Sequence, residues 1–310
     1  MSKIKIISLG NSRFFYLYDK LLLCYMGKLG RRLYELSKKF FKFLLDSNKY
    51  RIIDRFVNNQ DIHNPTLFSW IEIETLNRCN GKCSFCPVNA LAPQRKYAKM
   101  DGKLFRKIID ELSEIDYRGN INLFSNNEPF LDERIYEFAE YTRNKVPKAK
   151  ISILTNGLLL NIDNVDKILP YIDLLYIDNY SDSFKLLPTV KQIYDYGKNK
   201  VDYVKKILIS VRLQNEILST RGGESPNNKT NKINAKCTLP FKQIVVRPDG
   251  KISLCCNDAL GKMTLGDVNT DSLMNIWLSD MYRNIRHSIQ KNGRTKIKLC
   301  ENCDFASIEY

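Results

Sequence analysis

The feature that most constrains this chain is an alternation of short β-rich segments and longer helical segments between residues 68 and 213. The β-rich segments are residues 68–75, 120–124, 151–154, 174–178 and 207–213, and the helical ones are 101–115, 132–144, 164–171 and 188–198. Strands that alternate with helices in this way predict parallel βα units and an α/β fold. In folds of this kind, functional residues gather at the C-terminal ends of the strands.

The first predicted strand leads directly into a loop with three cysteines, Cys79, Cys83 and Cys86, spaced C-x3-C-x2-C. A [4Fe–4S] cluster takes thiolate ligands from cysteine, so three thiols leave one iron without a protein ligand. An open iron is able to bind a small molecule, which indicates a cluster that takes part in chemistry. A structural zinc site is the alternative, but such sites use paired C-x2–4-C units and often histidine, which this loop lacks.

Four further cysteines form a second set: Cys237, Cys255, Cys300 and Cys303. Their spacing suits either a zinc ion, held as a split ribbon, or a fully ligated second [4Fe–4S] cluster. The nine cysteines fall at metal-type spacings rather than in the pattern of a secreted disulfide framework. No signal peptide is evident, so we expect a cytoplasmic protein.

A β-hairpin is predicted between the first two cysteines of this set, because Asp249-Gly250 separates two apolar-rich runs. Alternation along its second strand puts Cys256 on the face of Ile252 and Cys255 on the opposite face. We therefore assign Cys255 as the ligand and Cys256 as a packed thiol.

Together these two cysteine sets closely resemble radical S-adenosylmethionine (radical SAM) enzymes with a SPASM-type domain, here in its short "twitch" form. Other residues that carry the resemblance are Asp249-Gly250, Asn257-Asp258, Gly266-Asp267-Val268 and Ile276-Trp277. The resemblance implies a partial (β/α)6 TIM-type barrel over residues 67–235 and a small β-hairpin and helix iron–sulfur (twitch) domain over residues 236–310. Residues 1–66 lie outside it as a basic, helical N-terminal extension.

The cofactors that the resemblance implies are SAM and two [4Fe–4S] clusters, one that binds SAM and one auxiliary. In this family, SAM bound to the open iron is cleaved to a 5′-deoxyadenosyl radical, and the cofactor carries the difficult chemistry. The second cysteine set then holds the auxiliary cluster, which accepts an electron. An external reducing partner such as flavodoxin or ferredoxin is also expected.

Polar residues at the predicted strand ends are the candidates for binding SAM. Residues 126–129 resemble the family's Gly-Gly-Glu-Pro segment with Asn in place of both glycines, and Asn tolerates positive φ better than most residues. Several candidates have a structural alternative: an ordinary turn for residues 126–129, a solvated surface arginine for Arg212 and core packing for Phe85. The full set is Phe85, Asn126, Asn127, Glu128, Thr155, Asn156, Asp178, Asn179 and Arg212.

Arg221, in Arg221-Gly222-Gly223, lies where members that oxidise cyclitols place an arginine near the reacting hydroxyl. Because arginine stays protonated, we assign it to orienting that hydroxyl and stabilising negative charge rather than to proton abstraction. The chain has only two histidines, so a proton must be transferred by Asp, Glu, Lys, Arg or Tyr. The implied reaction removes hydrogen from a carbohydrate-like or cyclitol-like substrate and oxidises a hydroxyl to a ketone.

Other functions stay open at this stage: peptide or protein maturation, sugar dehydration or epimerisation, tRNA modification, and a non-catalytic iron–sulfur electron carrier. The three-cysteine loop disfavours the carrier, since carriers normally ligate every iron. The tRNA alternative rests only on the net charge of +15. We expect a polyhydroxylated or anionic small molecule and no nucleic acid.

Residues 1–50 carry eleven Lys or Arg against three Asp or Glu, so about half of the excess charge lies at one end. Apolar residues there recur at helical spacing: Leu29, Leu33, Leu36, Phe40 and Phe43. They predict a surface helix packed on the barrel, with peripheral contact to an anionic membrane as the alternative. Cys24 is interpreted as a buried free thiol, and no apolar stretch is long enough to span a bilayer.

Overall fold

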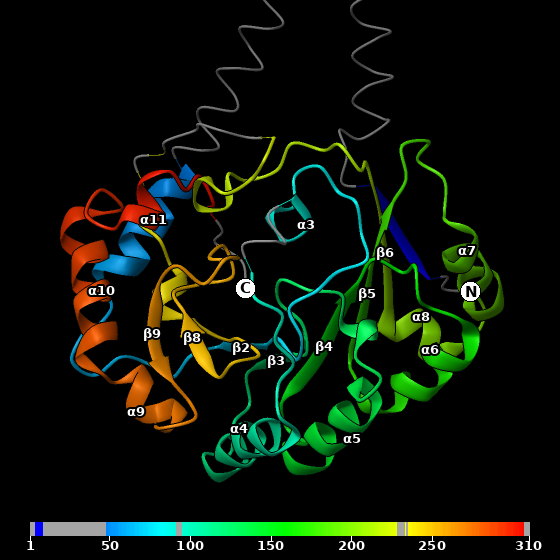
Figure 1. Cartoon of the computed structure of the whole chain (residues 1–310), viewed down its shortest axis with the longest axis horizontal. Coiled ribbons are helices and arrows are strands. Elements are labelled where there is room, and N and C mark those ends of the chain that lie inside the picture. The colour runs from blue at the N-terminus through cyan, green and yellow to red at the C-terminus, as the bar shows by residue number, and fades with distance from the viewer. Residues whose placement is uncertain (1–3, 9–47, 91–94, 228–232, 234, 307–310) are drawn as a thin grey trace, which may run out of the picture.

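The computed structural model of this chain describes residues 4–8, 48–90, 95–227, 233 and 235–306. It is organised around one sheet with strand order β1-β6-β5-β4-β3-β2-β7-β8-β9. Helices α4 to α8 lie along one side of the sheet, and α9 to α11 flank the end formed by β8 and β9 (Figure 1). The predicted α/β fold class is confirmed.

The βα units follow the predicted order. Their elements are β2 (Trp70–Ile73), α3 (Pro87–Ala90), α4 (Gly102–Glu114), β3 (Asn120–Asn122), η2 (Pro129–Leu131), α5 (Ile135–Lys145), β4 (Lys150–Thr155), α6 (Ile162–Ile168), η3 (Leu169–Tyr171), β5 (Leu174–Tyr180), α7 (Pro188–Gly197), α8 (Val201–Lys206), β6 (Ile207–Arg212) and η4 (Arg221–Gly223). Helix α4 shows why the sequence folds this way locally. The Asp101 side chain caps its first turn by accepting the N–H of Lys103, and Phe105, Ile108 and Leu112 bury its apolar stripe.

The barrel is open, and its edge strand comes from the N-terminus. Strand β1 (Lys5–Ser8) runs parallel to β6, with Lys5 opposite Leu208. The sequence interpretation placed these residues in a helical extension, so this strand was not foreseen. Four residues are too few to show a strand pattern without their partner strand.

The C-terminal domain continues the same sheet. It contains η5 (Leu239–Phe241), β7 (Gln243–Val246), β8 (Lys251–Ser253), β9 (Thr264–Asp267), α9 (Leu273–Trp277), α10 (Asp280–Asn292) and α11 (Lys298–Glu301). The predicted hairpin is present, since β7 and β8 pair antiparallel. In addition β7 pairs parallel with β2, so the hairpin is hydrogen-bonded directly to the barrel.

Residues 48–58 are helical and pack against the C-terminal domain rather than the barrel helices. The Gln290 side chain donates to the carbonyl of Val57 at 2.9 Å, and the N–H of Lys236 donates to Asp54 at 3.0 Å. The helix predicted from Leu29 to Phe43, and Cys24, lie outside the described residues.

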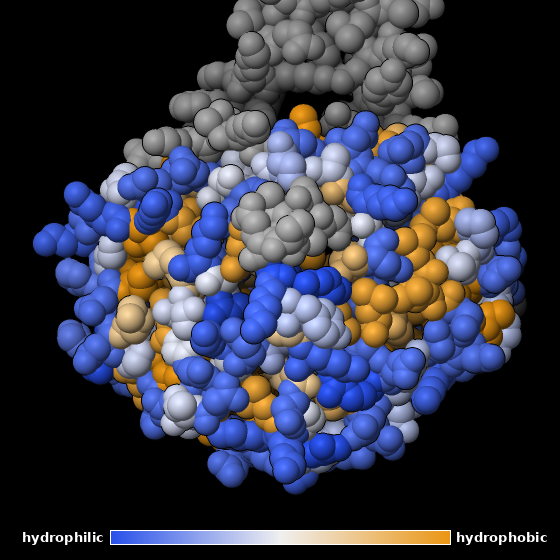
Figure 2. Space-filling model, viewed as in Figure 1, coloured by the Kyte–Doolittle hydropathy of each residue, from blue (hydrophilic) through white to orange (hydrophobic). Residues whose placement is uncertain are grey.

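The surface seen in Figure 2 is largely hydrophilic, with apolar side chains gathered mainly at the right of the view. Among the helices of the described residues, none has both the length and the apolar character needed to cross a bilayer.

Candidate active site

Three thiols come together in the loop that follows β2. Cys86 donates its N–H to the carbonyl of Cys83 at 3.1 Å, and the N–H of Gly81 points at Sγ of Cys79 at 3.3 Å. Burial raises the pKa of Cys79 to about 11 and that of Cys83 to about 12, and the charge of Cys86 adds to both shifts. Cys83 is buried and Cys79 and Cys86 are half-buried, and three thiols in one short loop are suited to an iron centre, which binds cysteine as thiolate.

The second thiol set is buried inside the C-terminal domain. Cys237, Cys300 and Cys303 all lie within electrostatic range of Cys255, and all four side chains are less than one-tenth exposed. Across the described ranges, no three His, Cys, Asp or Glu side chains converge closely enough to bind a single metal ion. We propose both sets as cluster ligands on the basis of their chemistry, burial and mutual proximity.

A buried cation lies beside the second set. Arg294 is 5% exposed and interacts electrostatically with all four thiols of that set. Its guanidinium donates to the carbonyls of Ala235, Lys236, Cys303 and Phe305. Arg294 therefore ties together the segments that enter and leave the C-terminal domain, and it offers positive charge to an anionic cluster.

A cavity of about 570 Å³ lies at the strand ends, between the barrel and the C-terminal domain. This volume is in the range of ligand-binding sites. All three thiols of the first set line one wall, and residues 256 and 257, directly after Cys255, line another. The predicted SAM candidates that line the cavity are Phe85, Asn126, Asn127, Glu128, Asn156, Asp178 and Arg212.

Glu128 fixes the turn after β3 to the end of β4. Its carboxylate accepts the hydroxyl of Thr155 at 2.7 Å and the N–H of Asn156 at 2.8 Å. Burial raises the pKa of Glu128. Thr155 thus supports the turn from behind and does not itself line the cavity.

The two asparagines of this turn have different surroundings. The Asn126 amide donates to the carbonyl of Cys256 at 3.1 Å and accepts a hydrogen bond from Arg221, so it bridges the two domains. Asn127 Oδ1 accepts the N–H of Ser125, whereas its buried Nδ2 has no hydrogen-bond partner within the described ranges. A buried donor of this kind in a cavity wall fits the carboxylate or ribose oxygens of SAM.

Asn156 connects the cavity to the thiol loop. Its Nδ2 donates to Oδ1 of Asn80 at 2.8 Å and lies 3.7 Å from Sγ of Cys79. The end of β4 therefore helps to orient the first thiol set.

The end of β5 presents Asp178 but not Asn179 to the cavity. Asp178 accepts hydrogen bonds from the hydroxyl of Tyr180 at 3.2 Å and from Arg212 at 3.5 Å. The fully buried Asn179 instead holds the loop after β5, since it bonds the carbonyl of Lys185 and the N–H of Leu187. Strand alternation turns Asn179 away, so the structure does not bring it to the site.

Two further predicted residues meet at the same side of the cavity. The ring of Phe85 lies 5.6 Å from that of Tyr180, and Arg212 is also held by Glu216 at 2.9 Å. Arg212 is thus a fixed, partly buried arginine rather than a surface one, as a carboxylate-binding role requires.

Arg221 enters the cavity from η4. It has φ +48, followed by Gly222 at +68 and Gly223 at +87, and this left-handed run points the Arg221 side chain inwards. Its Nη2 donates to Oδ1 of Asn126 and to the carbonyl of Cys256. Its buried Nε has no hydrogen-bond partner in the part of the chain that the structure covers, which leaves a donor for a ligand.

Sequence reasoning missed several cavity residues: Trp70, Glu72, Tyr180, Gln243, Cys256 and Asn257. Two carboxylates at Glu72 and Glu74 within a predicted buried strand were an available signal, because burying a charge is costly without a purpose. Cys256, interpreted as a packed thiol, instead lines the cavity. Strand β8 ends at Ser253, so the alternation that was used to place Cys256 does not extend that far.

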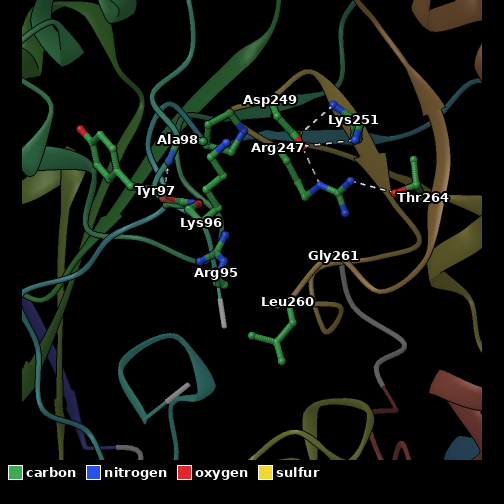
Figure 3. Close-up of a pocket in the computed structure, with 12 residues that line it drawn as sticks. Arg95, Lys96, Tyr97, Ala98, Arg247, Asp249, Lys251, Leu260, Gly261 and Thr264 are labelled. Carbon is green, nitrogen blue, oxygen red and sulfur yellow. Dashed lines mark hydrogen bonds and ion pairs between the residues drawn. The ribbon is translucent and has the colours of Figure 1, made fainter. Parts of the chain in front are cut away.

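A separate cavity of about 560 Å³ lies between residues 95–98 and the β7–β8 turn (Figure 3). It is basic, but its arginines are already engaged. Arg95 binds both oxygens of Glu74, at 2.8 and 2.9 Å, and Arg247 donates to Thr264 at 2.8 Å and lies near Asp249. No cysteine lines it. The cavity lined by the first thiol set is therefore the candidate active site.

Comparison with known proteins agrees with this geometry. The radical SAM superfamily profile matches residues 73–212, and the SPASM iron–sulfur cluster-binding domain matches residues 237–304. The chain is 28% identical over 246 residues to an S-adenosyl-L-methionine-dependent 2-deoxy-scyllo-inosamine dehydrogenase of Niallia circulans. That match covers 78% of this chain and 95% of the relative.

Among solved structures, BtrN in complex with AdoMet and 2-DOIA matches with a TM-score of 0.70 at 25% identity, covering 80% of this chain and 97% of BtrN. Streptococcus suis SuiB bound to S-adenosylmethionine matches with a TM-score of 0.51 at 16% identity, covering 72% and 69% of the two chains, and shows the fold alone. The cofactors of the two matched domains are SAM with a [4Fe–4S] cluster and an auxiliary iron–sulfur cluster. The chain thus contains a radical SAM domain followed by a C-terminal SPASM domain, and together with the dehydrogenase relative these matches support a radical SAM oxidoreductase.

Proposed function

We propose that this enzyme oxidises a hydroxyl of a cyclitol or a related polyhydroxylated small molecule to a ketone. The observation that carries the proposal is the position of the cavity between the two thiol sets. Cys79, Cys83 and Cys86 line one wall, and Cys255 is directly followed by the lining residue Cys256. A substrate bound there lies between a radical source and an electron acceptor, as a two-electron oxidation requires.

When bound, SAM with its cluster supplies a hydrogen-abstracting radical and the auxiliary cluster supplies an electron acceptor. Cys79, Cys83 and Cys86 are proposed to hold the first cluster. SAM is proposed to contact Phe85, Asn127, Asn156, Asp178 and Arg212, which line the cavity together with the first thiol set. A one-electron donor such as flavodoxin or ferredoxin would reduce the first cluster.

The remaining walls suit a substrate with several hydroxyls. Arg221, Glu72, Gln243 and Asn257 provide donors and acceptors on the side of the C-terminal domain. Arg221 is fixed through Asn126 and the carbonyl of Cys256, which leaves Nε to orient the reacting hydroxyl. The relative at 28% identity is a 2-deoxy-scyllo-inosamine dehydrogenase, which supports a cyclitol as the first substrate to test.

The test is anaerobic. The reconstituted and reduced enzyme receives SAM and 2-deoxy-scyllo-inosamine, and 5′-deoxyadenosine and ketone are both quantified. We expect equal amounts of the two products, and neither from the triple variant Cys79→Ala, Cys83→Ala, Cys86→Ala.

If 5′-deoxyadenosine forms while this cyclitol and a panel of cyclitols and amino sugars yield no ketone, the proposed hydroxyl oxidation is wrong. Dehydrated or epimerised products from the same panel would show that the enzyme catalyses dehydration or epimerisation instead.

A further inference from the structure

Glu72 is a buried carboxylate in the wall of the active-site cavity, and the residue roles proposed above include no acceptor for the hydroxyl proton. It lies on β2, opposite Asn122 of β3 and Val245 of β7, and is 7% exposed. The Ser125 hydroxyl donates to Oε2 at 2.7 Å and the Gln243 amide donates to Oε1 at 2.7 Å. The carboxylate is therefore held in one orientation by the turn after β3 on one side and by β7 on the other.

We propose that Glu72 is the general base that takes the hydroxyl proton of the substrate. The inference rests on the proposed function, and it adds the proton acceptor that this oxidation needs. With the cofactors bound, the 5′-deoxyadenosyl radical would supply the acceptor for the hydrogen atom on the substrate carbon and the auxiliary cluster the acceptor for the remaining electron. The Glu72 carboxylate takes the hydroxyl proton as the C–O bond becomes a carbonyl.

The other titratable groups in the cavity are poor candidates for this step. Glu128 holds Asn156, which lies beside the first thiol set, on the side of the cavity that we propose for SAM. Asp178 is paired with Arg212 on the side of the cavity that we propose for SAM. Burial raises the pKa of the Tyr180 hydroxyl and of the Cys256 thiol, so both stay protonated. Arginine side chains do not lose their proton.

Glu72 also faces Arg221, which we place at the reacting hydroxyl. Arg221 interacts electrostatically with Glu72, and both line the same cavity. An arginine that orients a hydroxyl beside a fixed carboxylate is a suitable pair for removing the hydroxyl proton.

The surroundings of Glu72 set its pKa near neutral pH. Burial raises its pKa to about 7, and this shift is opposed by hydrogen bonds from Ser125, Trp70 and Gln243 and by the charge of Arg221. The other ionisable groups nearby are Glu74 on the same strand and the Cys256 thiol. Below this pKa the group is protonated and cannot accept a proton, so ketone formation should rise with pH through about 7.

The chain offers a matched control on the same strand. Glu74 is also buried, and burial likewise raises its pKa to about 7, but Arg95 binds both its oxygens and it does not line the cavity. Glu74→Gln tests the effect of neutralising a buried carboxylate in β2 without touching the proposed base.

The experiment measures ketone and 5′-deoxyadenosine from 2-deoxy-scyllo-inosamine between about pH 6 and about pH 8. Wild type, Glu72→Gln, Glu72→Asp and Glu74→Gln are compared at equal cluster content. We expect Glu72→Gln to lower the ketone formed per 5′-deoxyadenosine by about 100-fold or more and to lose the rise with pH. Glu72→Asp should recover part of the yield together with the rise. Glu74→Gln should keep the wild-type ratio and the rise with pH, displaced toward lower pH because a neighbouring negative charge is removed.

A second readout needs no turnover. Protonated-carboxyl infrared intensity should disappear through about pH 7 in wild type, and the part of it that Glu72→Gln lacks should be retained in Glu74→Gln. Wild-type ketone per 5′-deoxyadenosine and an unchanged pH profile in Glu72→Gln would overturn the role of Glu72 while leaving the proposed function intact. No ketone from wild type despite SAM cleavage would instead overturn the proposed function, and this inference with it.

Discussion

Thr220 donates its hydroxyl hydrogen to the carbonyl of Asn302 at 2.6 Å. Its N–H also donates to Asp304 at 2.6 Å, so the residue before Arg221 is fixed to the segment around Cys303. The loop that carries the proposed substrate-orienting arginine is thus fastened to the loop that carries two thiols of the second set.

Thr220→Val should therefore reduce turnover by displacing Arg221. The change keeps the side-chain shape but leaves the Asn302 carbonyl without its donor, at a cost of about 1–3 kcal/mol. We expect lower ketone yield with both clusters still assembled, measured by product analysis and iron content. Thr270→Val is the control, because that exposed hydroxyl bonds only the carbonyl of Asp267; an equal loss in both variants would contradict the coupling.

Gly222→Ala should lower stability and turnover by more than the strain of its positive φ alone would cause. A Cβ at Gly222 would lie 2.7 Å from Cδ1 of Leu299, in addition to the strain of φ +68. The φ cost alone is about 1–2 kcal/mol, and in a Leu299→Ala background the same change should cost little more than that, because the contacting side chain is removed. Thermal unfolding and turnover of Gly222→Ala in both backgrounds separate the two effects, and an equal loss of melting temperature in both would show that Leu299 moves aside freely.

Arg294→Gln should make the potential of the auxiliary cluster more negative. The reduced cluster carries one more negative charge than the oxidised one, so a buried cation nearby favours reduction. Loss of about 1–3 kcal/mol of this stabilisation corresponds to roughly 40–130 mV for one electron. A redox titration followed by electron paramagnetic resonance measures the shift. Arg118→Gln, on an exposed residue, is the control and should leave the potential unchanged.

The raised pKa of Glu72 also predicts that the free energy of unfolding depends on pH. Its pKa is raised from 4.5 to about 7 in the folded chain, so its contribution to stability is fully present below pH 4.5 and is lost as pH rises to about 7. Glu72→Gln does not ionise and should gain stability relative to wild type over that window, by up to about 3 kcal/mol. Melting temperatures of both cluster-loaded proteins check this, and a constant difference across the window would mean that Glu72 is already ionised when buried.

The sequence predicted the βα order well, because each strand and helix shows its own periodicity. Most of the residues that it predicted to bind SAM do line the cavity, since strand ends of one sheet meet at one edge. Asn179 was misplaced because the twofold alternation allows only one of two adjacent residues to face the cavity. Strand β1 and the pairing of β2 with β7 could not be predicted, since both join segments that lie more than 150 residues apart.

The pairing of β2 with β7 has a consequence for electron flow. β2 is hydrogen-bonded on both edges, to β3 and to β7, and it leads into the loop of Cys79 while β7 belongs to the domain of Cys255. The segments that carry the two thiol sets are therefore tied together by strand pairing within one sheet. We expect this pairing to fix the distance between the clusters that they would hold, which favours substrate entry through the loops at the strand ends over separation of the domains.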